Sequence, residues 1–166
     1  RFVAEASRIK IGNGLQEGVT MGPMANARRI SAMDALVQDA VSRGANLVLG
    51  GQRLGRIGYF WPPTILKDVP DDARVMTEEP FGPIAPVVRF STFDDVIGRA
   101  NSLDYGLAAY ACNPVLRHGV SPTGLSIGTL NLCRWCPEHC CLTICGRRGR
   151  RCGASYLSKF FRPGVR

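Results

Sequence analysis

The clearest hydrophobic pattern in the chain lies between residues 26 and 43 and predicts an amphipathic helix. Apolar side chains recur there at spacings of three and four residues, at Ile30, Met33, Val37, Ala40 and Val41. This spacing places them on one face of a helix. Gly44 follows at the position where helices favour a left-handed residue. We therefore expect one buried stripe on a helix that is closed by Gly44.

Two shorter segments also have helical character. Residues 2–9 show a weak helical period, which ends at the glycines and the Asn of residues 11–14. Residues 92–101 begin at Thr92, a residue type that can cap a helix. They carry acids in the first turn and Arg99 in the last, which suits the helix dipole. We expect a helix in each segment.

Candidate strands alternate with these helices. They are rich in apolar and β-branched residues and cover residues 46–51, 84–90, 105–111, 125–132 and 155–161. Pro86 favours an edge position or a late start for the second of them, because proline lacks the ladder donor. Residues 133–153 show neither a helical nor a strand period. Since strands and helices alternate, we expect an α/β fold with a parallel-type sheet and crossover helices.

Composition divides the chain into two segments. Residues 1–111 contain 12 Lys and Arg and 12 Asp and Glu, with no Cys or His. Residues 112–166 contain a single acid, Glu138, and they supply the whole net charge of +8, all seven Cys and both His. Arguments from charge for a nucleic-acid or membrane partner therefore apply to this tail alone. We expect the two segments to be organised differently.

Two further features bear on the context of the chain. The sequence starts at Arg1 without an initiator Met, and it has no signal segment and no apolar run long enough to cross a bilayer. This start predicts an internal part of a longer protein. The balanced charge of residues 1–111 and their lack of Cys favour a cytoplasmic protein.

The cysteine-rich tail leaves several interpretations open. Cys133 and Cys136 form a CxxC that a His and further Cys follow, which suits zinc, but no second ligand pair stands at the usual distance. Residues 146–153, "GRRGRRCG", could contact phosphates, although they lack aromatics and a solvated basic loop is the plainer interpretation. The rise in Arg, Cys and Gly is also typical of a GC-rich gene read out of frame. We therefore predict no metal site.

The segment "MTEEPFGP", residues 76–83, combines two acids with a rigidly held aromatic ring. Proline fixes φ and removes a backbone donor, and Gly82 permits conformations closed to other residues. Phe81 is thus presented from a stiff, irregular segment directly after Glu78 and Glu79. Taken alone, the pattern favours a structural turn with Phe81 in the core, and a binding site is the alternative.

The "EEPFGP" part of this segment resembles the E-x-F-G-P motif of the NAD(P)-dependent aldehyde dehydrogenases. Four other motifs agree in order and spacing: "MGPMAN" (21–26), "GANLVLGG" (44–51), "GYFWPPTIL" (58–66) and "NSLDYGLAAY" (101–110). The resemblance covers residues 1–111, and "EEPFGPIAPVVRF" is most similar to the succinate-semialdehyde dehydrogenase branch. It implies that the chain is a C-terminal part of the family's catalytic domain.

The resemblance implies roles for two residues. Glu79 would accept hydrogen bonds from the hydroxyls of the nicotinamide ribose, and Phe81 would pack near the nicotinamide ring of NAD or NADP. A carboxylate suits paired hydroxyl donors, and an aromatic wall suits a flat heterocycle. The substrate would be a small-molecule aldehyde such as succinate semialdehyde. The intact enzyme would be a homo-oligomer with no nucleic-acid or membrane partner.

The resemblance also implies what the chain lacks. The family's nucleophilic Cys and Glu base, and its dinucleotide-binding domain, would lie upstream of Arg1. No catalytic residue is therefore expected in this chain, which should be inactive by itself. Downstream, residues 126–132 match the family, but residues 136–153 replace its P-F-G-G-x-K-x-S-G segment. We expect a disturbed C-terminal region, with a non-catalytic module that binds zinc or nucleic acid as the alternative function.

Overall fold

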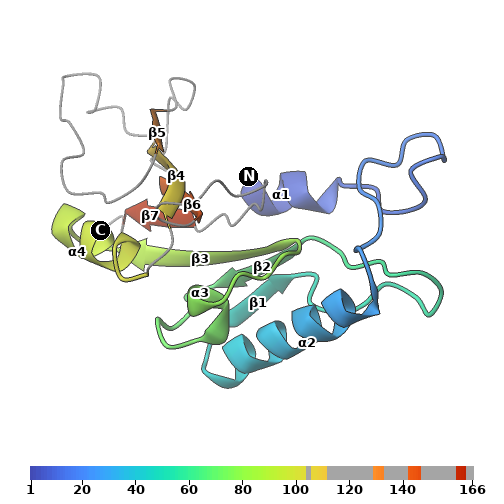
Figure 1. The fold of residues 1–166 in the computed structure, drawn as a ribbon, viewed down its shortest axis with the longest axis horizontal. Coiled ribbons are helices and arrows are strands. Elements are labelled where there is room, and N and C mark those ends of the chain that lie inside the picture. The colour runs from blue at the N-terminus through green and yellow to red at the C-terminus, as the bar shows by residue number, and fades with distance from the viewer. Residues whose placement is uncertain (104–105, 112–128, 133–141, 147–159, 164–166) are drawn as a thin grey trace. The chain divides into compact units, whose positions relative to one another are not determined.

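The computed structural model describes residues 1–103, 106–111, 129–132, 142–146 and 160–163 (Figure 1). The chain forms two compact units, Arg1–Pro86 and Val87–Arg166. The division expected at residue 111 is one of composition. Because residues 112–128 lie outside the described part of the chain, that division stays a prediction.

The first unit contains three helices and two complete strands among its described residues, and a third strand begins at its end. They are α1 (Phe2–Ser7), α2 (Ala27–Ser42), β1 (Asn46–Leu49), β2 (Thr64–Lys67), α3 (Arg74–Thr77) and β3 (Ile84–Phe90). β1 and β2 pair antiparallel, with Leu47 opposite Leu66. The first residues of β3 lie next to β2. β1 therefore ends the strand order of this unit.

Both ends of α2 lie where the sequence predicts them. The Oδ1 atom of Asn26 accepts a hydrogen bond of 3.2 Å from the backbone N–H of Arg29, which satisfies one of the free donors of the first turn. The helix ends at Arg43, and Gly44 follows with φ of +102°. Glycine adopts this left-handed conformation without the clash that a Cβ atom causes.

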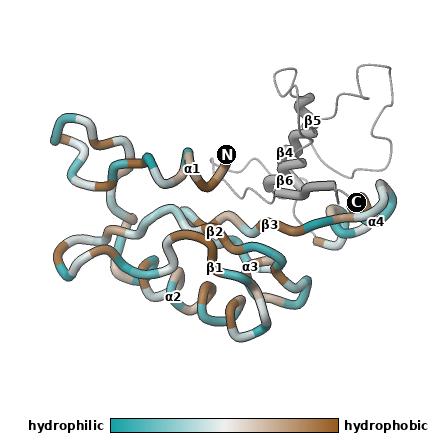
Figure 2. The backbone as a smooth tube through the Cα atoms, turned by 180° about the vertical axis from the view of Figure 1, so that it is seen from behind, coloured by the Kyte–Doolittle hydropathy of each residue, from teal (hydrophilic) through white to brown (hydrophobic). Residues whose placement is uncertain are grey.

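The buried stripe of α2 differs in one respect from the prediction. Its fully covered members are Met33, Leu36, Val37 and Ala40. Ile30 is half-buried, and Val41 is 43% exposed, so the prediction for Val41 is wrong. Leu36 is three residues after Met33 and four before Ala40, which places it at the centre of the face that Val41 only flanks. Apolar and polar positions alternate along the tube of α2 in Figure 2.

The core of the first unit lies between α2 and the segments that follow it. Side chains of several segments are buried there, namely Trp61, Ile65, Leu66, Val69, Val75, Met76, Pro80 and Ile84. α2 and α3 lie side by side. Each large apolar side chain that is removed from water contributes about 1.5–3 kcal/mol, so α2 and this core stabilise each other.

The second unit is a partly parallel sheet with one described helix. From Val87 onwards β3 pairs parallel with β7 (Phe160–Pro163), and β7 pairs antiparallel with β6 (Leu142–Gly146). β6 pairs antiparallel with β4 (Gly106–Ala111), and β4 pairs parallel with β5 (Thr129–Leu132). Two antiparallel pairings separate β4 from β7, so β3 and β4 run in the same direction.

The helix α4 (Phe93–Ala100) connects β3 to β4 and acts as a crossover, as predicted. The Oγ1 atom of Thr92 accepts a hydrogen bond of 3.2 Å from the backbone N–H of Asp95. Thr92 is therefore the N-cap that the sequence indicates. Val96 and Ala100 are buried.

The α/β class is confirmed, and the sheet is partly parallel. The sequence pattern does not indicate the antiparallel pairs, nor β2, α3 and β6 as elements. β1 and β2 pair antiparallel because residues 50–63 between them form no helix that would carry the chain back across the sheet. β6 lies inside residues 133–153, where neither period is present.

The prediction for Pro86 is wrong. β3 begins at Ile84, before the proline, and Pro86 is fully buried within the strand. The strand lies next to β2 in the first unit and next to β7 in the second. The pairing with β7 starts at Val87, directly after the residue that lacks an N–H group. A proline at this point therefore removes no hydrogen bond from that ladder.

Candidate functional site

The segment of residues 76–83 begins on the last turn of α3 and continues in extended backbone. Glu78, the C-cap of α3, has φ of −99° and ψ of 149°. Glu79 precedes Pro80, and a residue before proline is disfavoured in the helical region. The sequence therefore ends the helix here, and residues Glu79 to Pro83 follow as an irregular segment.

The two acids of the segment differ in what they bind. Arg74 donates two hydrogen bonds to Glu78, from Nε to Oε1 at 2.7 Å and from Nη2 to Oε2 at 3.1 Å. The hydrogen bonds from Arg74 hold the pKa of Glu78 below its usual range. Glu79 is half-buried, and its carboxylate has no partner among the residues that the structure describes. Glu79 is thus the acid whose acceptor capacity is available.

Phe81 is presented outward in a strained conformation. Its φ is +44°, which costs a residue with a Cβ atom on the order of 1–2 kcal/mol. Phe81 is 52% exposed, so it does not belong to the core of the first unit. The sequence pattern alone favours a core position for the ring, and the structure contradicts that interpretation. Strain of this kind persists where surrounding contacts enforce it and is typical of binding segments.

Arg29, on the first turn of α2, contacts both Phe81 and the backbone before it. Its Cζ atom lies 5.9 Å from the centroid of the Phe81 ring, and Nη1 donates a hydrogen bond of 3.4 Å to the carbonyl oxygen of Pro80. The sequence analysis does not identify Arg29. A positive charge in the first turn of a helix interacts unfavourably with the helix dipole. The position of Arg29 is therefore a signal in the sequence that its side chain makes a specific contact.

The backbone on either side of Phe81 is fixed by close packing. Pro80 is fully buried. A Cβ atom on Gly82 would collide with Sδ of Met33 and come within 2.9 Å of Cε of Met24. A side chain at this position would therefore displace two methionines, one from the stripe of α2 and one from the motif at residues 21–26. Phe81 is therefore held between two anchored neighbours.

The hydroxyl of Thr64 ties the following residues to the core. Its Oγ1 accepts hydrogen bonds from Nε1 of Trp61 at 2.9 Å and from the backbone N–H of Gly51 at 3.0 Å, and it donates to the carbonyl oxygen of Pro62 at 3.0 Å. The backbone N–H of Thr64 donates to the carbonyl oxygen of Pro83 at 2.7 Å. Thr64 is 1% exposed, so these bonds are shielded from water.

Four of the five sequence motifs therefore meet in the first unit. Residues 21–26 contact Gly82 through Met24, whose backbone N–H also donates to the carbonyl oxygen of Tyr59 at 2.7 Å. Residues 44–51 and 58–66 meet at Thr64, which holds Pro83 of the segment 76–83. Directly or through Thr64, these motifs hold the segment that carries Glu79 and Phe81.

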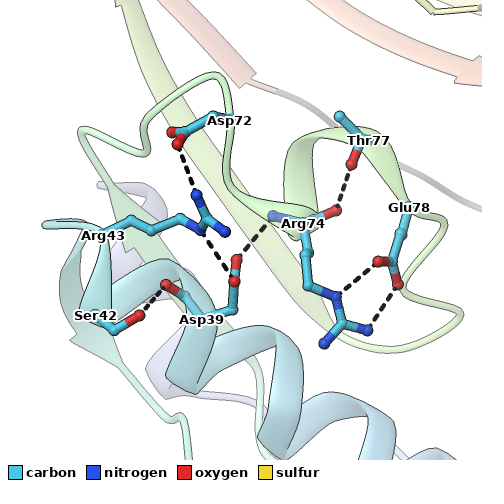
Figure 3. Close-up of polar contacts among 7 residues, drawn as sticks. All are labelled: Asp39, Ser42, Arg43, Asp72, Arg74, Thr77 and Glu78. Atoms are coloured by element: carbon cyan, nitrogen blue, oxygen red, sulfur yellow. Dashed lines mark hydrogen bonds and ion pairs between the residues drawn. The ribbon is translucent and has the colours of Figure 1, made fainter.

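A network of ion pairs and hydrogen bonds connects α2 to α3 and to the residues just before it (Figure 3). Oδ1 of Asp39 accepts a hydrogen bond from Nε of Arg43 at 3.0 Å, and Oδ2 accepts one from the backbone N–H of Arg74 at 2.8 Å. Nη1 of Arg43 also donates to Asp72 at 2.6 Å. The backbone hydrogen bond from Arg74 is the main reason that the pKa of Asp39 is lowered. Asp39 and Arg43 have the i, i+4 spacing that favours an ion pair on a helix, but the sequence gives no signal for their contacts with Asp72 and Arg74.

The tail chemistry lies largely outside the described residues. Cys133, Cys136 and His139 are not among them, so the zinc alternative and the basic segment of residues 146–153 stay open. Within the described ranges, no group of His, Cys, Asp and Glu side chains is arranged to hold a metal ion. In the same ranges, every helix is too short or too polar to span a membrane.

Comparison with known proteins places these features in a family. A model described as "Aldehyde dehydrogenase family" matches residues 1–135. The chain is 46% identical over 104 residues to the NADP(+)-dependent succinate-semialdehyde dehydrogenase of Escherichia coli, which covers 63% of this chain and 22% of that protein. It is 45% identical over 110 residues to the glutarate-semialdehyde dehydrogenase of Pseudomonas aeruginosa, covering 66% of this chain and 23% of that protein.

The fold leads to the same group of proteins. The crystal structure of succinate-semialdehyde dehydrogenase from Burkholderia pseudomallei matches with a TM-score of 0.72 and 34% identity, covering 78% of this chain and 27% of that one. The chain thus spans about a quarter of the length of the relatives that it matches. On the match of residues 1–135 and the shared fold, this chain belongs to the aldehyde dehydrogenase family.

Proposed function

We propose that this chain is the part of an aldehyde-oxidising enzyme that holds the nicotinamide end of NAD or NADP. The observation that carries the proposal is the difference between the two acids. Arg74 occupies the carboxylate of Glu78, whereas the neighbouring carboxylate of Glu79 is free of partners within the described part of the chain. A free, half-buried carboxylate beside a half-exposed aromatic ring fits a ligand that offers hydroxyl donors next to a flat ring.

Each residue of the segment would have a separate task. Glu79 would accept hydrogen bonds from the two ribose hydroxyls, and a charged acceptor makes such bonds stronger than a neutral one does. Phe81 would form one wall for the nicotinamide ring, and Arg29 would hold that wall in place from its side of the ring. Bound there, a nicotinamide cofactor supplies the hydride acceptor of the reaction.

The relatives and the sequence resemblance support a proposal for the substrate class. The Escherichia coli relative acts on succinate semialdehyde and the Pseudomonas aeruginosa relative on glutarate semialdehyde. We propose an aldehyde substrate of this kind, with succinate semialdehyde as the first to test. The nucleophilic Cys and the Glu base would lie in the rest of the enzyme, so we expect the 166-residue chain by itself to form no product.

The proposal is tested in a hybrid enzyme, in which residues 1–111 replace the matching segment of the Escherichia coli succinate-semialdehyde dehydrogenase. Glu79→Gln keeps one acceptor oxygen but loses the charge, so we expect it to weaken cofactor binding or hydride transfer by about 1–2 kcal/mol. The measurement is the KM for NADP and the kcat of aldehyde oxidation.

Glu17→Gln is the matched control, because Glu17 is an exposed acid in a loop and undergoes the same chemical change. It should leave both constants unchanged. If Glu79→Gln behaves like Glu17→Gln in an otherwise active hybrid, Glu79 does not bind the cofactor and the proposal fails.

A further inference from the structure

The position of Glu79 depends on α3, and α3 cannot hold its own shape. It has four residues, and an isolated helix of this length does not form in water because nucleation costs more than one turn returns. Its N-cap is Ala73, which has no side-chain acceptor to offer to the free N–H groups. Other parts of the chain must therefore fix this turn.

Asp39 of α2 supplies the missing cap. Its Oδ2 accepts the backbone N–H of Arg74, the first residue of α3, at 2.8 Å. Its Oδ1 accepts a hydrogen bond from Nε of Arg43, one turn along α2, which orients the carboxylate. The Asp39 side chain is 16% exposed, so water competes little for these bonds. Figure 3 shows the carboxylate directed at the start of α3.

The other end of α3 is fixed by its own first residue. The side chain of Arg74 reaches along the turn to both oxygens of Glu78, and Oγ1 of Thr77 donates to the carbonyl oxygen of Arg74 at 3.3 Å. The backbone of Arg74 is thus held by Asp39 while its side chain holds Glu78. Glu79, Pro80 and Phe81 follow Glu78 without an intervening residue.

We infer that Asp39 is a positioning residue for the Glu79–Phe81 segment, and that it acts through Arg74 and Glu78. This inference rests on the proposed function, since it concerns the same cofactor contacts. The carboxylate of Asp39 would then have two effects. Asp39 sets the direction in which the chain leaves α3, and it keeps Arg74 where Arg74 engages Glu78, so that Glu79 is the acid that faces a ligand.

A purely structural cap would have a different signature. Loss of such a cap lowers the unfolding temperature but leaves cofactor affinity unchanged in the folded protein. Asp72 provides the matched control within the same network, because it accepts a hydrogen bond from Arg43 and has none from Arg74. Asp72→Asn removes one charge beside Arg43 and leaves the cap of α3 in place.

The first experiment measures the dissociation constant of NADP and the KM values in the hybrid enzyme. Asp39→Ala should raise the dissociation constant about five- to tenfold, as expected for the loss of one ordering hydrogen bond. It should leave the KM for the aldehyde unchanged. Asp39→Asn should raise the constant less, because the amide oxygen can still accept the N–H of Arg74. Asp72→Asn should match the parent hybrid.

A second experiment uses the hybrid enzyme and needs no activity. Hydrogen exchange of the backbone amides of residues 74–79, 81 and 82 should become at least about tenfold faster in Asp39→Ala, and it should not change in Asp72→Asn. Unchanged exchange in Asp39→Ala overturns the inference, whether or not the hybrid enzyme is active.

The two proposals fail in different ways. If Glu79→Gln weakens NADP binding and Asp39→Ala does not, the proposed function stands and Asp39 is a structural cap only. If Glu79→Gln has no effect, the proposed function fails, and the exchange rates alone decide whether Asp39 positions the segment.

Discussion

At the scale of single residues, the packing next to Phe81 depends on the lack of a side chain at Gly82. The missing Cβ atom is what allows Met33 and Met24 to approach the backbone. Since Met33 is fully buried, its side chain has little space into which it can move. The glycine is thus required for close packing, not for an unusual φ.

Gly82→Ala tests this requirement. Insertion of a methyl group into a packed core costs about 1–3 kcal/mol, so the hybrid enzyme should unfold at a lower temperature. It should also bind NADP more weakly, because the neighbouring Phe81 shifts with the backbone. Gly14→Ala is the control, since a Cβ atom there meets nothing within 4 Å. A thermal transition of Gly82→Ala equal to that of Gly14→Ala would contradict this account.

At the scale of elements, α2 serves both the core and the site. Its buried stripe packs in the first unit, its first turn carries Arg29 to Phe81, and its last turns carry Asp39 to the start of α3. The three tasks lie on different parts of one helix surface. Met33 is fully buried and Val41 is exposed, so the face that includes Met33 contributes most to the stability of the fold.

Replacement of Met33 and of Val41 by alanine separates these faces. Met33→Ala leaves a cavity beside Gly82 and should cost about 2–5 kcal/mol. Val41→Ala should change stability by less than about 0.5 kcal/mol, because Val41 is exposed and lies outside the core. Thermal unfolding of the two hybrid variants measures the difference. Equal losses would mean that the rest of the intact enzyme covers Val41.

Much of the element structure could be predicted from the sequence, for identifiable reasons. α2 and α4 carry a clear period and a capping residue at the start, Asn26 and Thr92. α3 and β2 have four residues each, which is too few for a period to emerge. Pro86 misled the strand prediction, because sequence alone does not tell on which side of a strand the missing donor falls.

The site was predicted in part for similar reasons. Glu79 and Phe81 were identified through a motif that is contiguous in sequence, and their roles stay predictions. Arg29, Asp39 and Thr64 act through contacts with residues far away in the chain. Partners at such separations leave no local pattern, so only the structure indicates them.

At the scale of the whole chain, the described part includes an edge strand with exposed apolar residues. β1 ends the strand order, and Leu47 and Val48 are each 41% exposed on it. An apolar edge of this kind invites pairing between molecules. The exposed edge expected at residues 84–90 is not present, because β3 has neighbours, and β1 takes that place.

We therefore expect the 166-residue chain to self-associate in reducing buffer. Val48→Lys should reduce the association, because pairing of two β1 edges would bury the lysine charge and the charge opposes such pairing. Leu54→Lys is the control, since Leu54 is similarly exposed but lies in a loop. Light scattering at matched concentrations measures the effect. A monodisperse parent chain with a sharp thermal transition would contradict the prediction.

The hydrogen bond between Trp61 and Thr64 also gives the protein an internal spectroscopic probe. The indole N–H of Trp61 is buried and bonded to the same threonine whose backbone holds Pro83, two residues from Phe81. The indole proton should therefore exchange slowly with water, and its NMR resonance should shift when a ligand moves the segment. Occupancy of the site can then be followed by NMR without a label attached to the protein or to the ligand.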